Sequence, residues 1–279
     1  MIRARRFISF KTPVSVAIDC TDLPYYGKKD NPELLKWLIG TSKQKGTSMA
    51  FRFITLCVVV KGRRFTVAVL PVNKFDAMPD LVERLIRSAL KTVRIERIYL
   101  DRGFYSVDVI KKLEDMGMGY VMPIVKHKAK NPDKDIVLLI KKNYGEGKDK
   151  FVFTMGTKYS EVSFTVVIIK RDDDKNPMGF ATNTKISSKS IDKMYGKRWG
   201  IETGYAVKNK FRMPTCIRKS MAVRLLFTMI PFVIYNLWVL VNVFERFLLG
   251  NGRFLKNNES YVTTFYLRKM IEGLILSIP

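Results

Sequence analysis

Short apolar runs rich in β-branched residues alternate with segments of helical periodicity along the first half of the chain. Residues 14–19 form one such run, and after a polar, Gly- and Lys-rich stretch at 26–46 two more follow at 51–60 and 65–69. The last two runs flank Lys61-Gly62-Arg63-Arg64, in which glycine favours a turn. The pattern therefore predicts one buried strand followed by an antiparallel hairpin.

The periodicity then changes to that of amphipathic helices separated by strands. Leu81, Leu85 and Ile86 recur at helical spacing after Pro79 and Asp80, which is a common start signal. The predicted elements, in order, are a helix at 79–90, a strand at 94–100, a helix at 107–116 with Ser106 as its cap and Gly117 as its stop, and a strand at 120–125.

The second half of the chain departs from this alternation. Basic and Gly/Asp-rich stretches at 126–174 separate three β-like runs, which predict a small β-rich insertion at 136–140, 151–155 and 162–169. The later predicted elements are a short strand at 178–183, a long helical segment from 187, a helix at 225–238 and a helix at 261–276.

This order of elements predicts an α/β fold of the ribonuclease-H-like type. We expect a mixed five-stranded sheet flanked by helices, with a β-rich insertion before the helix that carries Glu202. The expected domain organisation is a first part of the core at 1–125, the insertion at 126–177, a second part of the core at 178–247 and a C-terminal helical tail at 248–279.

The charge of the chain indicates a polyanionic partner. Among 279 residues there are 50 Lys and Arg against 25 Asp and Glu, a formal net charge of +25. Each cation placed against a phosphate releases condensed counterions, so nucleic acid is the first expectation and a membrane surface the second. The apolar stretch 225–244 contains Pro231, Asn236 and Asn242, which favours a core helix over a membrane span.

Cysteine and histidine usage excludes several kinds of site. Three widely spaced cysteines and a single histidine give no disulfide framework and no Cys/His zinc cluster, and they indicate a reducing, intracellular compartment. His127 lies in a lysine-rich run typical of a solvated loop, so Ser-His-Asp and Cys-His catalysis are not expected. Carboxylates are the remaining candidates for chemistry.

Two acids stand at the predicted ends of neighbouring strands. Asp19 ends the first strand, and Asp101 follows the strand at 94–100, just before Gly103. Either acid alone is as typical of a cap on a turn as of a metal ligand. Together they would be two like charges close in space, which is unfavourable without a bound cation. The pair favours a metal site.

A third acid lies on a predicted helix. At about 100° per residue, Tyr195, Arg198 and Glu202 share one face, and Arg198 and Glu202 are an i,i+4 pair. An ordinary surface ion pair explains that spacing as well. Gly196 and Gly200 in the same segment argue against selection for helix stability alone.

These residues resemble a known family. The resemblance is carried by Asp19 in its strand, by Asp101-Arg102-Gly103-Phe104-Tyr105, and by Tyr195-x2-Arg198-x3-Glu202. Their order is similar to that of the DDE transposases of bacterial and archaeal insertion sequences, in the branch with the Tyr-Arg-Glu-Lys signature. The resemblance covers residues 14–245.

The resemblance implies a role for each residue. Asp19, Asp101 and Glu202 would be the catalytic triad, and Tyr195 and Arg198 would orient the glutamate or contact DNA phosphate. The signature lysine is expected at position 209, which is Asn209 here. Lys208 lies about 120° from Glu202 around the helix and Lys210 about 80°, so both are candidate DNA contacts and Lys210 is the better substitute.

The resemblance also implies a mechanism and partners. The three acids would hold two Mg²⁺ or Mn²⁺ ions about 3.5–4 Å apart for in-line phosphoryl displacement, first cutting DNA and then joining the 3′-OH to target DNA. Oxygen ligands suit these hard cations. We expect DNA as the partner (transposon ends and target), a homodimer in the DNA complex, no membrane, and a cytoplasmic, nucleoid-associated location in a prokaryote.

Two alternatives remain open from the sequence. One is another ribonuclease-H-like nuclease, which would use the same carboxylates without strand transfer. The other is a truncated, inactive DNA-binding remnant of a transposase, suggested by Asn209 and by the 18 residues that precede Asp19, where relatives place a DNA-binding domain.

Overall fold

The computed structural model describes most of the chain. The described residues are 12–28, 31–44, 46–60, 64–125, 135–156, 160–172, 174–208 and 220–249. The predicted helix at 261–276 and His127 lie outside them, as do Asn209 and Lys210.

Five strands form the centre of the sheet in the order expected for a ribonuclease-H-like core. The order β4-β3-β1-β5-β6 comprises β1 (Val14–Pro24), β3 (Thr47–Val58), β4 (Thr66–Pro71), β5 (Ile95–Leu100) and β6 (Tyr120–Pro123). The predicted hairpin is confirmed, since β3 runs antiparallel to both β1 and β4. The crossovers that follow give parallel pairing of β1 with β5 and of β5 with β6.

The prediction of a five-stranded sheet is wrong, because the sheet continues past β6 and gains a strand beside β3. The further strands are β9 (Met178–Thr182), β8 (Glu161–Ile169), β7 (Lys150–Gly156) and β2 (Leu38–Gln44), which bring the sheet to nine strands among the described residues. β9 pairs with β6, and β8 and β7 follow in antiparallel order, so backbone groups that would be unpaired at the edge of β6 are satisfied.

The predicted strand at 136–140 is also wrong, since these residues belong to helix α5 (Ile136–Gly145). The Asp135 carboxylate accepts hydrogen bonds from the Val137 and Leu138 amides, which caps the first turn. The short helix α2 (Pro32–Leu35), which precedes β2, was not predicted, although Asn31 caps its first turn and Pro32 begins it.

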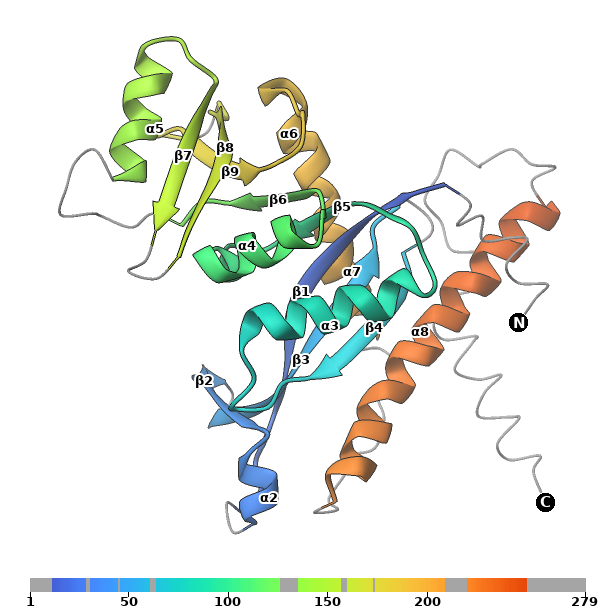
Figure 1. The fold of residues 1–279 in the computed structure, drawn as a ribbon. Helices are drawn as coiled ribbons and strands as arrows, with labels where there is room; N and C mark the ends of the chain where they lie inside the picture. The colour runs from blue at the N-terminus through green and yellow to red at the C-terminus, as the bar shows by residue number, and fades with distance from the viewer. Residues whose placement is uncertain are drawn as a thin grey trace, which may run out of the picture.

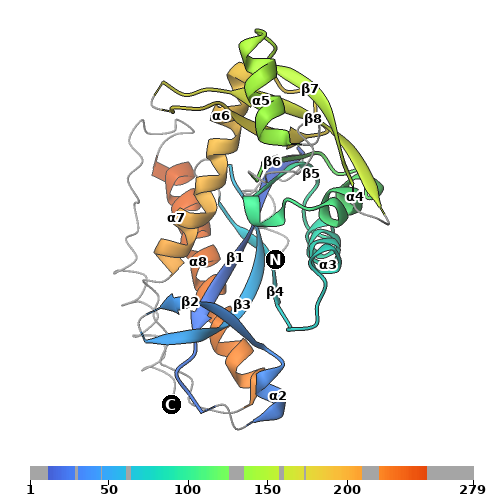
Figure 2. The same ribbon diagram turned by 90° about the vertical axis from the view of Figure 1, so that its left-hand side faces the viewer.

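Helices cover both faces of the sheet (Figures 1 and 2). α3 (Met78–Leu90) and α4 (Val107–Asp115) lie on one face, where they contribute to the main hydrophobic core. The predicted cap and stop of α4 are confirmed, because Ser106 accepts from the Val109 amide and Gly117 has a φ of 63°.

The opposite face carries α6 (Ser188–Tyr195), α7 (Trp199–Lys208) and α8 (Met221–Leu249) (Figure 2). α8 contacts α7 and β4. By length and composition alone, its residues 222–243 form the one described helix that could cross a membrane. The expectation of a core helix holds for one face, which buries Phe232, Tyr235 and Val239, whereas Leu226 and Val233 on another face are exposed.

Asn236 fastens α8 to the edge of the sheet. Its side-chain Oδ1 accepts from the Thr66 amide at 2.9 Å, and its Nδ2 donates to the Thr66 carbonyl oxygen at 2.7 Å. Both backbone groups of this β4 residue are thereby satisfied by one side chain.

Replacing Asn236 by leucine is expected to reduce the free energy of unfolding by about 1–3 kcal/mol, because two partly buried backbone groups lose their partners. Urea denaturation followed by circular dichroism measures the change. Val233→Ala, at an exposed position of the same helix, is the control and should stay within about 0.5 kcal/mol of the parent chain. Equal stability of the two variants would contradict the proposed fastening.

Candidate active site

The register of two parallel strands brings the first two acids together. The pairing of β1 with β5 ends at Ile18 opposite Leu100, so Asp19 and Asp101 both follow the last paired residues. The prediction that the first strand ends at Asp19 is wrong, because β1 continues to Pro24 in antiparallel pairing with β3. The site thus lies where β1 leaves β5, and the chain turns away after Asp101 into a 3₁₀ turn.

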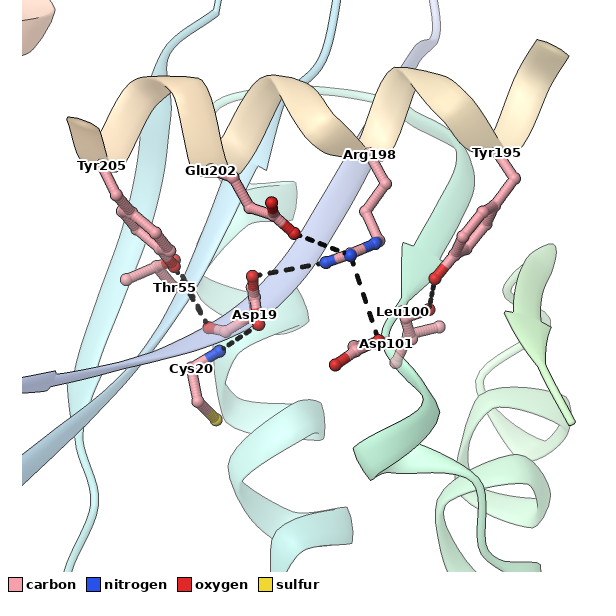
Figure 3. A network of polar contacts seen from close by, with 9 residues as sticks. All are labelled: Asp19, Cys20, Thr55, Leu100, Asp101, Tyr195, Arg198, Glu202 and Tyr205. Carbon is pink, nitrogen blue, oxygen red and sulfur yellow. Dashed lines mark hydrogen bonds and ion pairs between the residues drawn. The ribbon is translucent and has the colours of Figure 1, made fainter. Parts of the chain in front are cut away.

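The third acid comes from a segment that crosses above these strands (Figure 3). A single helix was predicted, but α6 ends at Tyr195, a 3₁₀ turn spans Gly196–Arg198, and α7 begins at Trp199. In Figure 3 the side chains of Tyr195, Arg198 and Glu202 nevertheless all point toward β1 and β5. The shared face predicted from spacing is therefore present.

One guanidinium lies among all three carboxylates. Arg198 Nη2 is 2.8 Å from Glu202 Oε1 and 4.0 Å from Asp101 Oδ1, and Arg198 Nη1 is 3.4 Å from Asp19 Oδ2. Only 8% of the Arg198 side chain is exposed. Because three negative charges share one cation, the cluster keeps a net negative charge. Asp19 and Asp101 gain a partner from a distant part of the sequence, whereas Glu202 pairs with the arginine four residues before it.

Asp19 is the most enclosed of the three acids. Its pKa is raised to about 6 from an ordinary value near 3.8, chiefly by burial and to a smaller extent by the negative charges of Asp101 and Glu202. The Cys20 amide, which donates to Asp19 Oδ1 at 2.8 Å, and the Arg198 guanidinium lower the pKa but do not cancel the effect of burial. A carboxylate with this pKa is poised to exchange a proton for a cation near neutral pH.

Tyr195 supports the site from the side. Its hydroxyl donates to the Leu100 carbonyl oxygen at 3.1 Å, immediately before Asp101, and its ring packs edge-on against Tyr99. Burial raises the pKa of this phenol, so it stays a neutral donor. The centre of the Tyr195 ring also lies 5.0 Å from that of Phe180 in β9 and 5.7 Å from the Arg198 guanidinium carbon. The DNA contact predicted for Tyr195 stays a prediction.

Two further residues position Asp19 and were not identified from the sequence. The hydroxyls of Thr55 and Tyr205 bond each other, and each lies 3.5 Å from the Asp19 carbonyl oxygen. Thr55 is fully buried in β3, which is unusual for a polar side chain among apolar neighbours. In the sequence, Thr55 is the one hydroxyl residue of the apolar run 51–60, and this was the available signal that its side chain has a polar partner.

Of the two candidate lysines the structure describes Lys208, which it does not bring to the carboxylates. Lys208 lies on the face of α7 away from Glu202, with its ammonium 4.4 Å from the centre of the Phe232 ring. Lys210 lies outside the described residues. The DNA contacts predicted for both residues stay predictions.

The donor set suits a hard divalent cation. Asp19, Asp101 and Glu202 offer carboxylate oxygens only, which are the ligands that Mg²⁺ and Mn²⁺ prefer. Within the described ranges no three acidic, Cys or His side chains are close enough to form a metal cluster, and Arg198 lies between the acids. The same oxygens are thus shared with a protein cation in this state.

The sequence and the fold are similar to those of known proteins. The sequence model of the family described as the transposase DDE domain matches residues 11–237. No curated protein sequence matches the chain. A similar solved structure is the piggyBac transposase in a synaptic complex with hairpin DNA, with a TM-score of 0.57 and 14% identity over 94% of this chain. The chain spans 58% of the length of that protein.

A second solved structure is less similar to this chain. Endonuclease V of Ciona intestinalis, in complex with DNA that contains inosine followed by a ribo-adenosine, gives a TM-score of 0.34 and 10% identity. The match covers 65% of this chain and 76% of that protein. A TM-score this low supports no conclusion about fold, so the likeness in architecture is taken from the piggyBac structure alone.

Arg198→Met is expected to destabilise the protein by about 1–3 kcal/mol in EDTA, because three carboxylates lose the one cation that pairs with them among the described residues. Mn²⁺ at millimolar concentration should restore more stability to this variant than to the parent. Thermal denaturation with and without Mn²⁺ measures both effects. The control Arg171→Met removes an exposed Arg171–Asp192 pair and should change stability by less than about 1 kcal/mol in either condition.

The raised pKa of Asp19 predicts a pH dependence of stability. In EDTA the folded state retains a proton up to about pH 6 that the unfolded chain releases near pH 3.8. The stability contributed by this proton is complete below the lower value and is lost as the pH rises through the higher one. Relative to Asp19→Asn, the parent should lose about 2–3 kcal/mol between pH 4 and 7, measured by urea denaturation. A parallel pH profile for the two proteins would contradict the assignment.

Proposed function

This chain belongs to the family of transposase DDE domains, and we propose that it cuts DNA strands and joins the resulting 3′ end to target DNA. The observation that carries the proposal is the convergence of Asp19, Asp101 and Glu202 on one guanidinium, where β1 and β5 diverge. Three acids from three distant segments would repel one another, and a site of this kind is typical of phosphoryl transfer assisted by divalent cations.

The three acids would hold two Mg²⁺ or Mn²⁺ ions. Such ions, when bound, would lower the pKa of the attacking water or 3′-OH and would neutralise the charge that develops on the leaving oxygen. The chain itself supplies rigid placement: Asp19 is held through its backbone by Thr55 and Tyr205, and Asp101 through Leu100 by Tyr195. Such fixed positions favour in-line attack because little reorganisation is needed.

Arg198 has a second proposed role. Its guanidinium and the divalent ions compete for the same carboxylate oxygens. When the acids are engaged by metal, Arg198 is free to donate its N–H groups to a DNA phosphate, which a planar guanidinium can bind in bidentate fashion. Together with Tyr195 and Glu202 this matches the proposed assignment to the Tyr-Arg-Glu-Lys branch of bacterial and archaeal insertion sequences.

DNA is the proposed partner. The excess of 50 basic over 25 acidic residues supports backbone contacts by counterion release, and Lys208 and Lys210 are proposed among them. We further propose a homodimer in the complex with transposon ends and target, and a cytoplasmic, nucleoid-associated location in a prokaryote, without a membrane partner. The domain boundaries at 125, 177 and 247 remain part of this proposal.

The Asp101→Ala variant is expected to lose metal-dependent nicking of supercoiled plasmid by more than about 100-fold, because even residues behind a metal ligand contribute 10–100-fold. Parent and variant are incubated with Mg²⁺ or Mn²⁺, and nicked and linear products are scored on gels. Asp115→Ala, an exposed acid at the end of α4, is the matched control and should retain activity.

Adding DNA with a pre-cut 3′ end to this assay distinguishes a transposase from a related nuclease and from an inactive remnant. Joining of a pre-cut 3′ end to plasmid identifies a transposase, whereas cutting without joining identifies a related nuclease. Salt-sensitive DNA binding without any cleavage by the parent would identify an inactive remnant and would contradict the proposed activity.

A further inference from the structure

The turn at 73–76, between β4 and α3, carries the most exposed large apolar side chain in the described part of the chain. Phe75 is 80% exposed, and Lys74 beside it is exposed as well. Single exposed apolar side chains are common on protein surfaces and by themselves indicate no function. Two features distinguish Phe75: the way in which its turn is held, and the position of that turn relative to the carboxylates.

All four backbone amides of the turn have a hydrogen-bond partner. The Asn73 amide donates to Asp76 Oδ2 at 2.7 Å, the Phe75 amide to Asn73 Oδ1 at 3.0 Å, and the Asp76 amide to the Asn73 carbonyl oxygen at 3.1 Å. The Lys74 amide donates at 2.8 Å to the carbonyl oxygen of Lys36, which ends α2, so the turn lies beside that helix (Figures 1 and 2). The turn is thus fixed at four points, and it presents the Phe75 ring to solvent in a preorganised way.

The turn lies at the same end of the sheet as the candidate active site. Asp19 pairs with Thr55 of β3, and Thr55 pairs with Val69 of β4. β1 and β4 both run antiparallel to β3, so both leave this row in the same direction. Phe75 follows Val69 by six residues. Two strand spacings and this length of chain place Phe75 within about 30 Å of Asp19.

That distance fits one bound duplex. One turn of B-form DNA measures about 34 Å along its axis. A duplex held at the carboxylates therefore reaches the turn at 73–76 within one helical repeat, without a bend in the protein.

The charges around the turn suit a polyanion. Lys74 forms no ion pair with any residue in the described ranges. Arg84 pairs with Asp76 at 3.7 Å, and 58% of its side chain is exposed. Two cations therefore accompany one acid at the turn, in keeping with the net charge of +25 of the whole chain.

The surroundings of Phe75 fit nucleic acid better than a protein partner. A protein-docking surface usually joins several apolar side chains into a patch of a few hundred Å². The other residues of this turn, Asn73, Lys74 and Asp76, are all polar. A single aromatic ring among polar groups is typical of the apolar wedges that DNA-binding proteins insert between neighbouring base pairs.

We propose that the turn at 73–76 is a DNA-contacting element, in which the Phe75 ring inserts between two neighbouring base pairs and Lys74 binds the adjacent phosphate. The contact lies within one helical turn of the DNA that the carboxylates engage. This inference rests on the proposed function, because it takes DNA as the substrate.

DNA with one mismatched base pair is the probe. Insertion of a ring requires unstacking, and a mismatched step costs less to unstack than a matched one. In EDTA, the parent should bind a duplex of about 16 base pairs roughly 5–10-fold more tightly when it contains a central mismatch, as measured by fluorescence anisotropy. Phe75→Ala should bind the matched duplex about 10-fold more weakly than the parent does and should lose the preference for the mismatch.

The salt dependence of binding separates the two residues. Phe75→Ala should leave the slope of log K against log salt unchanged, because phenylalanine neutralises no phosphate. Lys74→Met should reduce that slope by about 1 and keep the preference for the mismatch.

Two further variants test whether the ring itself is responsible. Phe75→Trp keeps an aromatic ring and should keep the mismatch preference of the parent. Val152→Ala removes a side chain that is 72% exposed on β7, at the other end of the strand order, and should bind both duplexes as the parent does. Circular dichroism confirms that each variant is folded.

The outcomes distinguish this inference from the proposed function. If the parent binds DNA and Phe75→Ala keeps both its affinity and its mismatch preference, the inference is overturned and the proposed function stands. If Phe75→Ala changes the oligomeric state without DNA, measured by sedimentation, and keeps the mismatch preference, the ring belongs to a protein interface and the inference is again overturned. A parent that binds neither duplex overturns the proposed function and this inference together.

Discussion

The arrangement of the candidate active site depends on one interaction, the sharing of the Arg198 guanidinium by three carboxylates. The acids come from β1, from the end of β5 and from α7, so a single side chain links segments about 180 residues apart. Like charges at this separation oppose folding, and a buried cation in their midst offsets that repulsion. The same cation gathers the three proposed metal ligands, which among the described residues are not close enough to one another to form a metal cluster without it.

The sheet determines where this interaction can form. Parallel pairing between β1 and β5 stops at Ile18 and Leu100, and the residue that follows each of them in the sequence is an acid. Tyr195 bonds Leu100 from above, and Tyr205 approaches Asp19 one turn beyond Glu202. The helix and the strands are thus tied together by polar contacts on either side of the acids, as Figure 3 shows.

Much of the core could be predicted from the sequence, because its elements have strong local signals. The helix of Leu81 and Leu85, the Ser106 cap and the hairpin before them all depend on residues close in sequence. The apolar run at 136–140 fits a strand or a helix equally well, and only the Asp135 cap decides between them. The extent of β1 and the joining of β9 to β6 depend on long-range pairing, which no local pattern encodes.

The residues of the candidate site divide in the same way. Asp19, Asp101 and Glu202 could be proposed from strand ends and helix spacing. Tyr205 carried no such signal, and Thr55 carried only its isolated hydroxyl in an apolar run, which does not indicate its partner.

The fastening of β4 by Asn236 has a consequence for association between molecules. A side-chain amide that accepts from one N–H and donates to the same residue's C=O imitates the peptide group of a neighbouring strand. A strand from another molecule would have to displace it before it could add to this edge. One asparagine on a helix therefore protects an open sheet against edge-to-edge aggregation at this point.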